Sequence, residues 1–62
     1  MKIVCSDNFN RDSVSDWLVA ENVTSQYIGE RIVNLLNVQE GLESPNYFKL
    51  VANDYELYKW EP

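Results

Sequence analysis

"TSQYIGERIVNLLNVQEGL", residues 24–42, is the stretch that decides the fold. Apolar residues recur in it at three- and four-residue spacing, which places them along one side of an α-helix. These residues are Ile28, Ile32, Val33, Leu35 and Leu36. Thr24 or Ser25 can cap the start of the helix, and Gly41 followed by Leu42 is typical of a glycine C-cap with its hydrophobic contact. The stretch therefore predicts an amphipathic helix that packs on another layer.

Two further elements are predicted before this helix. Residues 2–5, "KIVC", form a short apolar and β-branched run that ends at the turn-like "SDN", which indicates a strand buried on both faces. In residues 8–22, "NFNRDSVSDWLVAEN", Val14, Trp17 and Leu18 fall at helical spacing. Asn10 or Ser13 can cap the start of this segment. We therefore expect a first helix between the strand and residue 22.

The end of the chain predicts a β-hairpin. Two β-rich runs, "NYFKLVA" (46–52) and "YELYKW" (55–60), flank the turn dipeptide Asn53-Asp54. The expected fold class is α+β, in the order β-α-α-β-β, with a three-stranded sheet and two helices packed on one face. Its 62 residues make a single small domain, residues 1–62.

The register of the hairpin decides which aromatic rings face outward. A two-residue loop places Tyr47 opposite Trp60 and Lys49 opposite Tyr58, on the face away from the helices. An odd loop would move Tyr58 and Trp60 into the core, because a one-residue slip sends every side chain of a strand to the other face. We favour the even register, in which Lys59 lies on the core face near a strand end and can extend its amine to water.

An outward aromatic face has two readings. The rings can be ordinary cross-strand pairs that stabilise a thin sheet, or they can form a binding patch, since Tyr and Trp are enriched at binding hot spots. The predicted partner-binding residues are Tyr47, Val51, Glu56, Tyr58 and Trp60.

Composition excludes most kinds of active site. The chain has no histidine and one cysteine, Cys5, so a His-assisted nucleophile, a structural zinc site and an intrachain disulfide are all excluded. "NFNRDS" (8–13) begins like a calcium loop, but it lacks the glycine and Val19 stands where a bidentate Glu belongs. We therefore expect no enzyme, no catalytic residue, no cofactor and no metal.

Charge and hydropathy limit the partners. Ten acids and five bases give a net charge of −5, and the bases are scattered, which argues against nucleic-acid binding. No apolar run has membrane-spanning length. The free cysteine and the lack of a targeting segment indicate the cytoplasm.

Both ends of the chain resemble a family. "SDNFNRDSVSDWLVAEN" (6–22) and "YFKLVANDYELYKWEP" (47–62) resemble small uncharacterised acidic proteins encoded by tailed bacteriophages. The resemblance carries no known activity and no site residues. It implies a class of proteins that often act by binding a host protein.

The expected function is therefore a non-enzymatic protein-binding domain, such as a phage-encoded inhibitor or accessory factor that acts through the outer hairpin face. The alternative is an acidic DNA mimic that occupies the nucleic-acid site of a host enzyme. A small-ligand carrier is a third option, which the small core disfavours. An open hairpin edge also predicts a homodimer, held nearly equal to a monomer that awaits a host protein.

Overall fold

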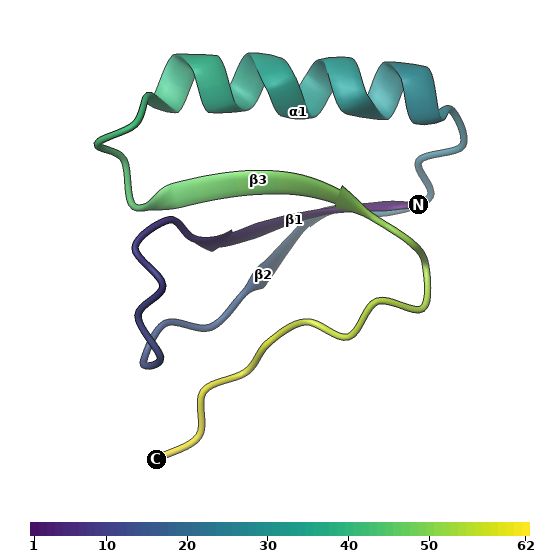
Figure 1. Cartoon of the computed structure of the whole chain (residues 1–62). Helices are drawn as coiled ribbons and strands as arrows, with labels where there is room; N and C mark the ends of the chain where they lie inside the picture. The colour runs from purple at the N-terminus through teal and green to yellow at the C-terminus, as the bar shows by residue number, and fades with distance from the viewer.

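The computed structural model describes all residues, 1–62, and has one helix and three strands (Figure 1). Along the chain they are β1 (Lys2–Asp7), β2 (Trp17–Ala20), α1 (Gln26–Glu40) and β3 (Asn46–Val51). The predicted β-α-α-β-β order with two helices is wrong: the first predicted helix is replaced by a loop and β2, and the predicted second hairpin strand does not form.

The strands form one antiparallel sheet in the order β2-β1-β3. β1 contains the predicted strand 2–5 and is central, with Val4 opposite Lys49 on one side and Leu18 on the other. The pairing with β2 shifts between Ile3 and Val4, which is a bulge in a short edge strand. The central position of β1 explains why its middle residues are buried from both faces.

Non-local pairing turns residues 17–20 into a strand. Trp17, Leu18 and Val19 suit a pleated strand as well as a helix, so their spacing alone does not decide between the two. Asn10 and Asn22 have positive φ angles of 54° and 62°, which interrupt regular structure on either side. Pairing of Trp17 with Cys5 across the sheet then fixes the extended form.

The predicted helix at residues 24–42 is present as α1, with its expected caps. The Ser25 side chain accepts a hydrogen bond from the Ile28 backbone N–H at 3.2 Å. Gly41 has a φ of 79°, and its N–H donates to the Asn37 carbonyl at 3.0 Å. Local signals therefore suffice to place this element.

α1 lies over β3, and the core forms between them (Figure 1). Buried residues at its centre are Ile3, Cys5, Val33 and Phe48. Gly29 allows the close approach of the helix, because a Cβ there would lie 2.9 Å from Cδ1 of Leu50. β2, the strand farthest from α1 in Figure 1, is left without a helix above it.

Residues 52–62, here called the C-terminal strap, run back beneath the opposite face of the sheet (Figure 1). A turn in which the Tyr55 N–H donates to the Ala52 carbonyl starts this path. The strap forms no strand against β3, so both predicted hairpin registers are wrong. The side chain of Val4, which points away from α1, is completely buried. The strap thus takes the place of a second covering layer.

Candidate functional site

Asp16 anchors the C-terminal strap to the start of β2. Its carboxylate accepts a hydrogen bond from the Tyr58 backbone N–H at 2.9 Å and from the Tyr55 hydroxyl at 3.2 Å. The Asp16 N–H donates to the Tyr58 carbonyl at 2.8 Å. Nearby, the Trp60 N–H donates to the Ser15 hydroxyl at 3.0 Å. These contacts join segments that are far apart in the sequence.

A lysine completes the network. Lys49 on β3 donates to the Tyr55 hydroxyl at 2.7 Å, and its amine lies 4.8 Å from the centre of that ring. Burial alone would raise the pKa of the Asp16 carboxyl, but the bond from the Tyr58 N–H, with Tyr55 and the charge of Lys49, outweighs it and holds the pKa below its usual value. The carboxylate is therefore stabilised in its charged form.

This network borders an open cavity of about 290 Å³ on the strap side of the sheet. Its walls also include Ser6, whose hydroxyl oxygen is buried without a hydrogen-bond partner. No group of three acidic or cysteine side chains is placed to hold a metal ion. Burial raises the pKa of the Cys5 thiol, and that residue lies in the core on the other face. The polar groups along this cavity supply hydrogen bonds that fix the strap.

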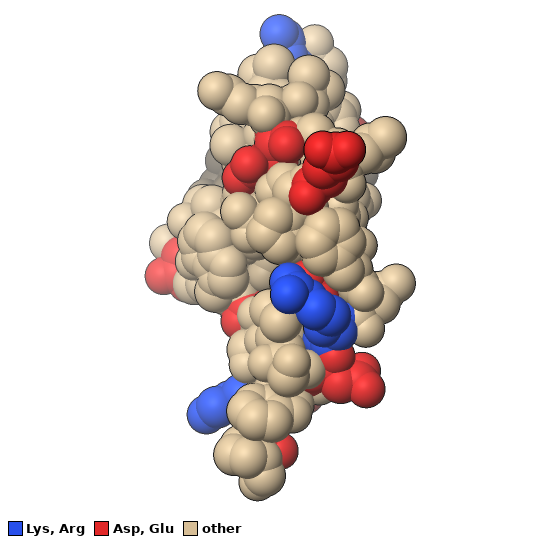
Figure 2. All heavy atoms as spheres, turned by 90° about the vertical axis from the view of Figure 1, so that its left-hand side faces the viewer, with Lys and Arg blue, Asp and Glu red and all other residues tan.

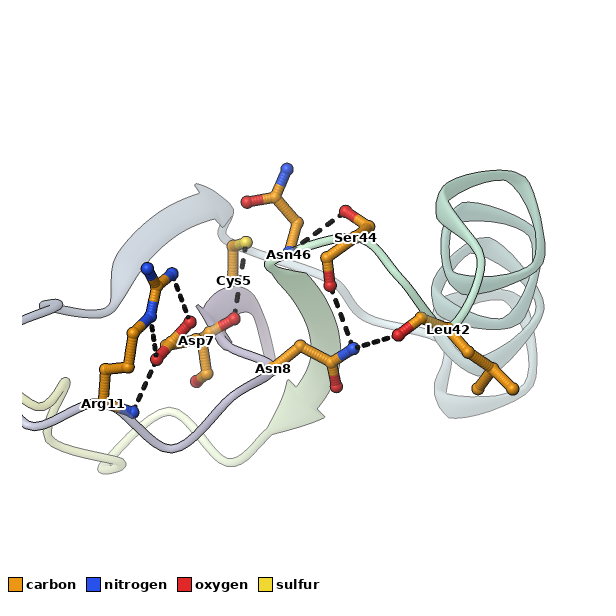
Figure 3. Close-up of polar contacts among 8 residues, drawn as sticks. Cys5, Asp7, Asn8, Arg11, Leu42, Ser44 and Asn46 are labelled. Carbon is orange, nitrogen blue, oxygen red and sulfur yellow. Dashed lines mark hydrogen bonds and ion pairs between the residues drawn. The ribbon is translucent and has the colours of Figure 1, made fainter.

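A second polar cluster fixes the loop after β1 (Figure 3). Arg11 donates to both carboxylate oxygens of Asp7, at 2.9 and 3.0 Å, and this holds the pKa of Asp7 at about 2. The Asn8 amide donates to the carbonyls of Leu42 at 3.3 Å and Ser44 at 3.0 Å. The cluster ties the 8–12 loop to the segment after α1, beside a cavity of about 490 Å³ to which it contributes Asn8.

The five predicted partner-binding residues do not share one strand pair. Tyr47 and Val51 lie on β3, whereas Glu56, Tyr58 and Trp60 lie on the strap. Tyr47, Tyr58 and Trp60 are each a little under half exposed. Tyr58 is held by a hydrogen bond from its hydroxyl to the Asp12 carbonyl, and Lys49 contacts Tyr55 rather than Tyr58. Their use as a binding site stays a prediction.

A different apolar surface lies beside α1, on the side of β2. Trp17 is 51% exposed, and Ile28, Ile32 and Leu35 are 49%, 41% and 67% exposed. Trp17 meets Phe48 edge to face, with ring centres 6.4 Å apart, so it lies on the helix side of the sheet. We call these four residues the open face.

The side of α1 that bears the open face follows from its other contacts. Gly29 and Val33 point to the sheet, and Asn34 and Asn37 border the outer edge of β3. Because residues advance by about 100° around a helix, Ile28 and Ile32 lie on the opposite flank, toward β2. The sequence predicts Ile28, Ile32 and Leu35 as part of the apolar side with which the helix packs, and Trp17 as part of a neighbouring helix, so their exposure could not be expected from it.

The chain exposes more surface than its mass requires. Its accessible area is 4684 Å². A compact monomer of 7.3 kDa exposes about 4,200 Å² by the general scaling of area with mass. The excess is more than half of the ~800 Å² that one partner contributes to a standard interface.

Hydrogen bonds already occupy part of the β3 edge and the residue before β2. On β3, the side chain of Asn37 bonds to the N–H and carbonyl of Phe48, and the Asn46 N–H donates to the Ser44 hydroxyl. At the start of β2, the N–H of Asp16 is bonded to the strap. The homodimer was predicted to form through the edge of a C-terminal hairpin. That hairpin is absent, so this mode of pairing has no structural basis.

The distribution of charged side chains says less about the partner than the exposed apolar residues do. Figure 2 views one end of the molecule, where acidic side chains lie on both the upper and the lower half and basic side chains form separate groups at the top, centre and lower left. Asp7 and Asp16 are engaged in bonds within the chain, which removes two of ten acids from any imitation of DNA phosphates. The DNA-mimic alternative stays a prediction.

No helix here has the length and apolarity needed to cross a membrane. The chain matches no protein-family model, no curated protein and no solved structure significantly. Its function therefore has to be argued from the geometry of its own surfaces.

Proposed function

We propose that this chain is a non-enzymatic protein-binding domain and that its binding surface is the open face. The observation that carries the proposal is that two exposed apolar elements face the same side of the sheet: the half-exposed Trp17 on β2, a strand that no helix covers, and the apolar flank of α1 that is turned toward β2. Large exposed apolar patches on small proteins mark interaction sites. Tryptophan in particular supplies binding energy at the centre of interfaces.

Burial of the open face would supply part of the free energy of binding. Each large apolar side chain that passes from full exposure to full burial contributes roughly 1.5–3 kcal/mol. The four residues start about half exposed, so together they offer on the order of several kcal/mol before the cost of association. A rim of polar contacts would add specificity. Such an interface suits a regulatory partner better than a permanent one.

The resemblance to phage proteins indicates which kind of organism supplies the partner. We propose a host protein as the target, with inhibition or assistance of that protein as the outcome. The buried free thiol of Cys5 supports a reducing compartment such as the cytoplasm.

Affinity capture from a bacterial lysate tests the proposal with three baits. The first is the wild-type chain, and the second carries Trp17→Ser with Ile32→Gln on the open face. The third carries Tyr27→Ser with Val38→Gln, two residues that are 67% and 80% exposed on the far flank of α1. We expect one protein to be captured by the first and third baits and lost from the second, with all three folded by circular dichroism.

A fourth bait compares the two candidate surfaces. Tyr58→Ala with Trp60→Ala removes the aromatic rings of the strap. If that bait alone loses the partner, the binding surface is the one predicted from the sequence and the open face is wrong. Repeating the capture over a range of salt concentrations addresses the DNA mimic, whose binding would weaken steeply as salt screens exposed charges.

A further inference from the structure

We propose that the element received by the open face is a basic amphipathic α-helix, which lies over β2 beside α1. This inference rests on the proposed function and specifies the chemistry of the partner. It is carried by three observations: the width of the uncovered sheet, the limited free length of the strand edges, and the net negative charge of the chain.

The uncovered part of the sheet has the width of one helix. Neighbouring strands lie about 4.8 Å apart, and packed helices lie about 8–10 Å apart. Since α1 lies over β3, a second helix at that distance lies two strands away, over β2. The position is vacant in this chain because residues 8–16 form a loop rather than a helix.

α1 presents the ridge that a neighbouring helix needs. Ile28, Ile32 and Leu35 follow one another at four- and three-residue spacing along the flank toward β2. Such rows fit between the side chains of an adjacent helix. Trp17 on β2 adds an exposed aromatic ring on the same side of the sheet as α1.

Addition of a partner strand is the competing mode, and the edges oppose it. The Asn37 side chain occupies both backbone groups of Phe48 on β3. On the other edge, β2 has four residues, contains a bulge and begins where the strap bonds to Asp16. Extended peptides add to a sheet through a row of free backbone groups. Neither edge offers a long row.

The net charge of the chain, −5, favours a basic partner. Residues 12–30, which include β2 and the first turn of α1, contain no Lys or Arg. Of their four acids, Asp12 and Asp16 border the cavity on the strap side and Glu30 borders the outer edge of β3, so the preference rests on the net charge and not on a local acidic cluster. Arg31 follows, but its guanidinium donates to the Tyr27 hydroxyl at 3.3 Å and lies 5.6 Å from that ring, on the far flank. A second copy of the chain would bring another net charge of −5 to this surface, which opposes self-association here.

Designed peptides test the inference. The probe is a fluorescent 18-residue peptide of Leu and Lys with the apolar period of a helix. One control replaces every Lys by Glu, and a second has the Leu/Lys composition in an order without that period. We expect the probe to bind the wild-type chain, the scrambled peptide to bind at least tenfold more weakly, and the Glu peptide not to bind.

Matched protein variants locate the site. Ile32→Gln is expected to weaken probe binding at least tenfold, and Val38→Gln, which makes the same kind of change on the far flank, to leave it within twofold. If the scrambled peptide binds equally well, or if Ile32→Gln has no effect, attraction is by charge alone and the inference is overturned.

Self-association is a separate outcome. Sedimentation equilibrium measures it. A wild-type dimer that Ile32→Gln dissociates would overturn the basic helix, because the open face would then bind a second copy of the chain. The open face would remain a protein-binding surface. If lysate capture does not change with Trp17→Ser and Ile32→Gln, the proposed function is wrong in its binding surface, because the partner then binds elsewhere on the chain.

Discussion

The side-chain amide of Asn37 pairs with the backbone of Phe48 as a neighbouring strand would. Its nitrogen donates to the Phe48 carbonyl and its oxygen accepts from the Phe48 N–H, each at 2.8 Å. Phe48 is buried on an edge strand, so these backbone groups have little access to water. One helical side chain thus satisfies and covers the middle of the β3 edge.

Asn37→Ala should lower the free energy of unfolding by about 1–3 kcal/mol, because it leaves a partly buried N–H and carbonyl without partners. Urea denaturation measures the change. Asn34→Ala, on the same helix but exposed, is the control and should change stability by less than about 0.5 kcal/mol. Equal effects of the two substitutions would show that the Asn37 pairing has no energetic role.

Asp16→Asn should flatten the loss of stability in acid. The pKa of Asp16 is lowered in the folded chain, below the roughly 3.9 of an unfolded aspartate, so its carboxylate stabilises the fold above about pH 4. That contribution disappears as the pH falls through the lowered pKa. Urea midpoints from pH 7 to pH 2 should therefore fall less in the variant, and the exposed Asp54→Asn should behave like the wild type.

The Asp7 carboxyl should titrate near pH 2 by nuclear magnetic resonance, because Arg11 bonds to both of its oxygens. Arg11→Gln should move this pKa up toward its ordinary value of 3.8. In the folded wild type, the ion pair contributes stability above the unfolded pKa and loses it below pH 2. A midpoint that stays the same in the variant would contradict the bidentate pair.

The Cys5 thiol should react slowly with a disulfide reagent at pH 8 in the folded chain. It is 2% exposed, and burial raises its pKa, so both access and thiolate are reduced. In denaturant the reaction should become fast. A reaction that is equally fast without denaturant would place the thiol at the surface.

Ile32→Gln should leave the stability of the isolated chain within about 0.5 kcal/mol, because that side chain is 41% exposed and has no partner within the chain's core. Ile3→Ala, in the core, should cost about 2–5 kcal/mol. Thermal or urea unfolding separates the two. A large loss from Ile32→Gln would mean that the open face stabilises the chain itself.

Local signals were sufficient for β1 and α1. The "KIVC" run and the stripe, Ser25 cap and Gly41 stop of the helix act within a few residues, and all are present in the structure. Residues 17–20 differ because their strand exists through pairing with β1, and three apolar residues at mixed spacing do not distinguish a helix from a strand. Because residues 17–20 form β2, the first of the two predicted helices is absent.

The hairpin failed for a related reason. Asn53-Asp54 is a weak turn signal, and Tyr55 and Tyr58 find partners at Asp16, far away in the sequence. No spacing within residues 46–60 carries that information. The open face could not be predicted either, since Trp17 was expected on a helix beside α1 and lies instead on β2, where no helix covers it.

The strap also has a consequence for the rate of folding. Asp16 and Tyr58 are 42 residues apart, and β1 pairs with β3 over a similar separation. Closing such loops costs chain entropy before the contacts that reward it can form. We therefore expect this chain to reach its native state more slowly than a helical bundle of equal length, on the millisecond scale of mixed α and β domains.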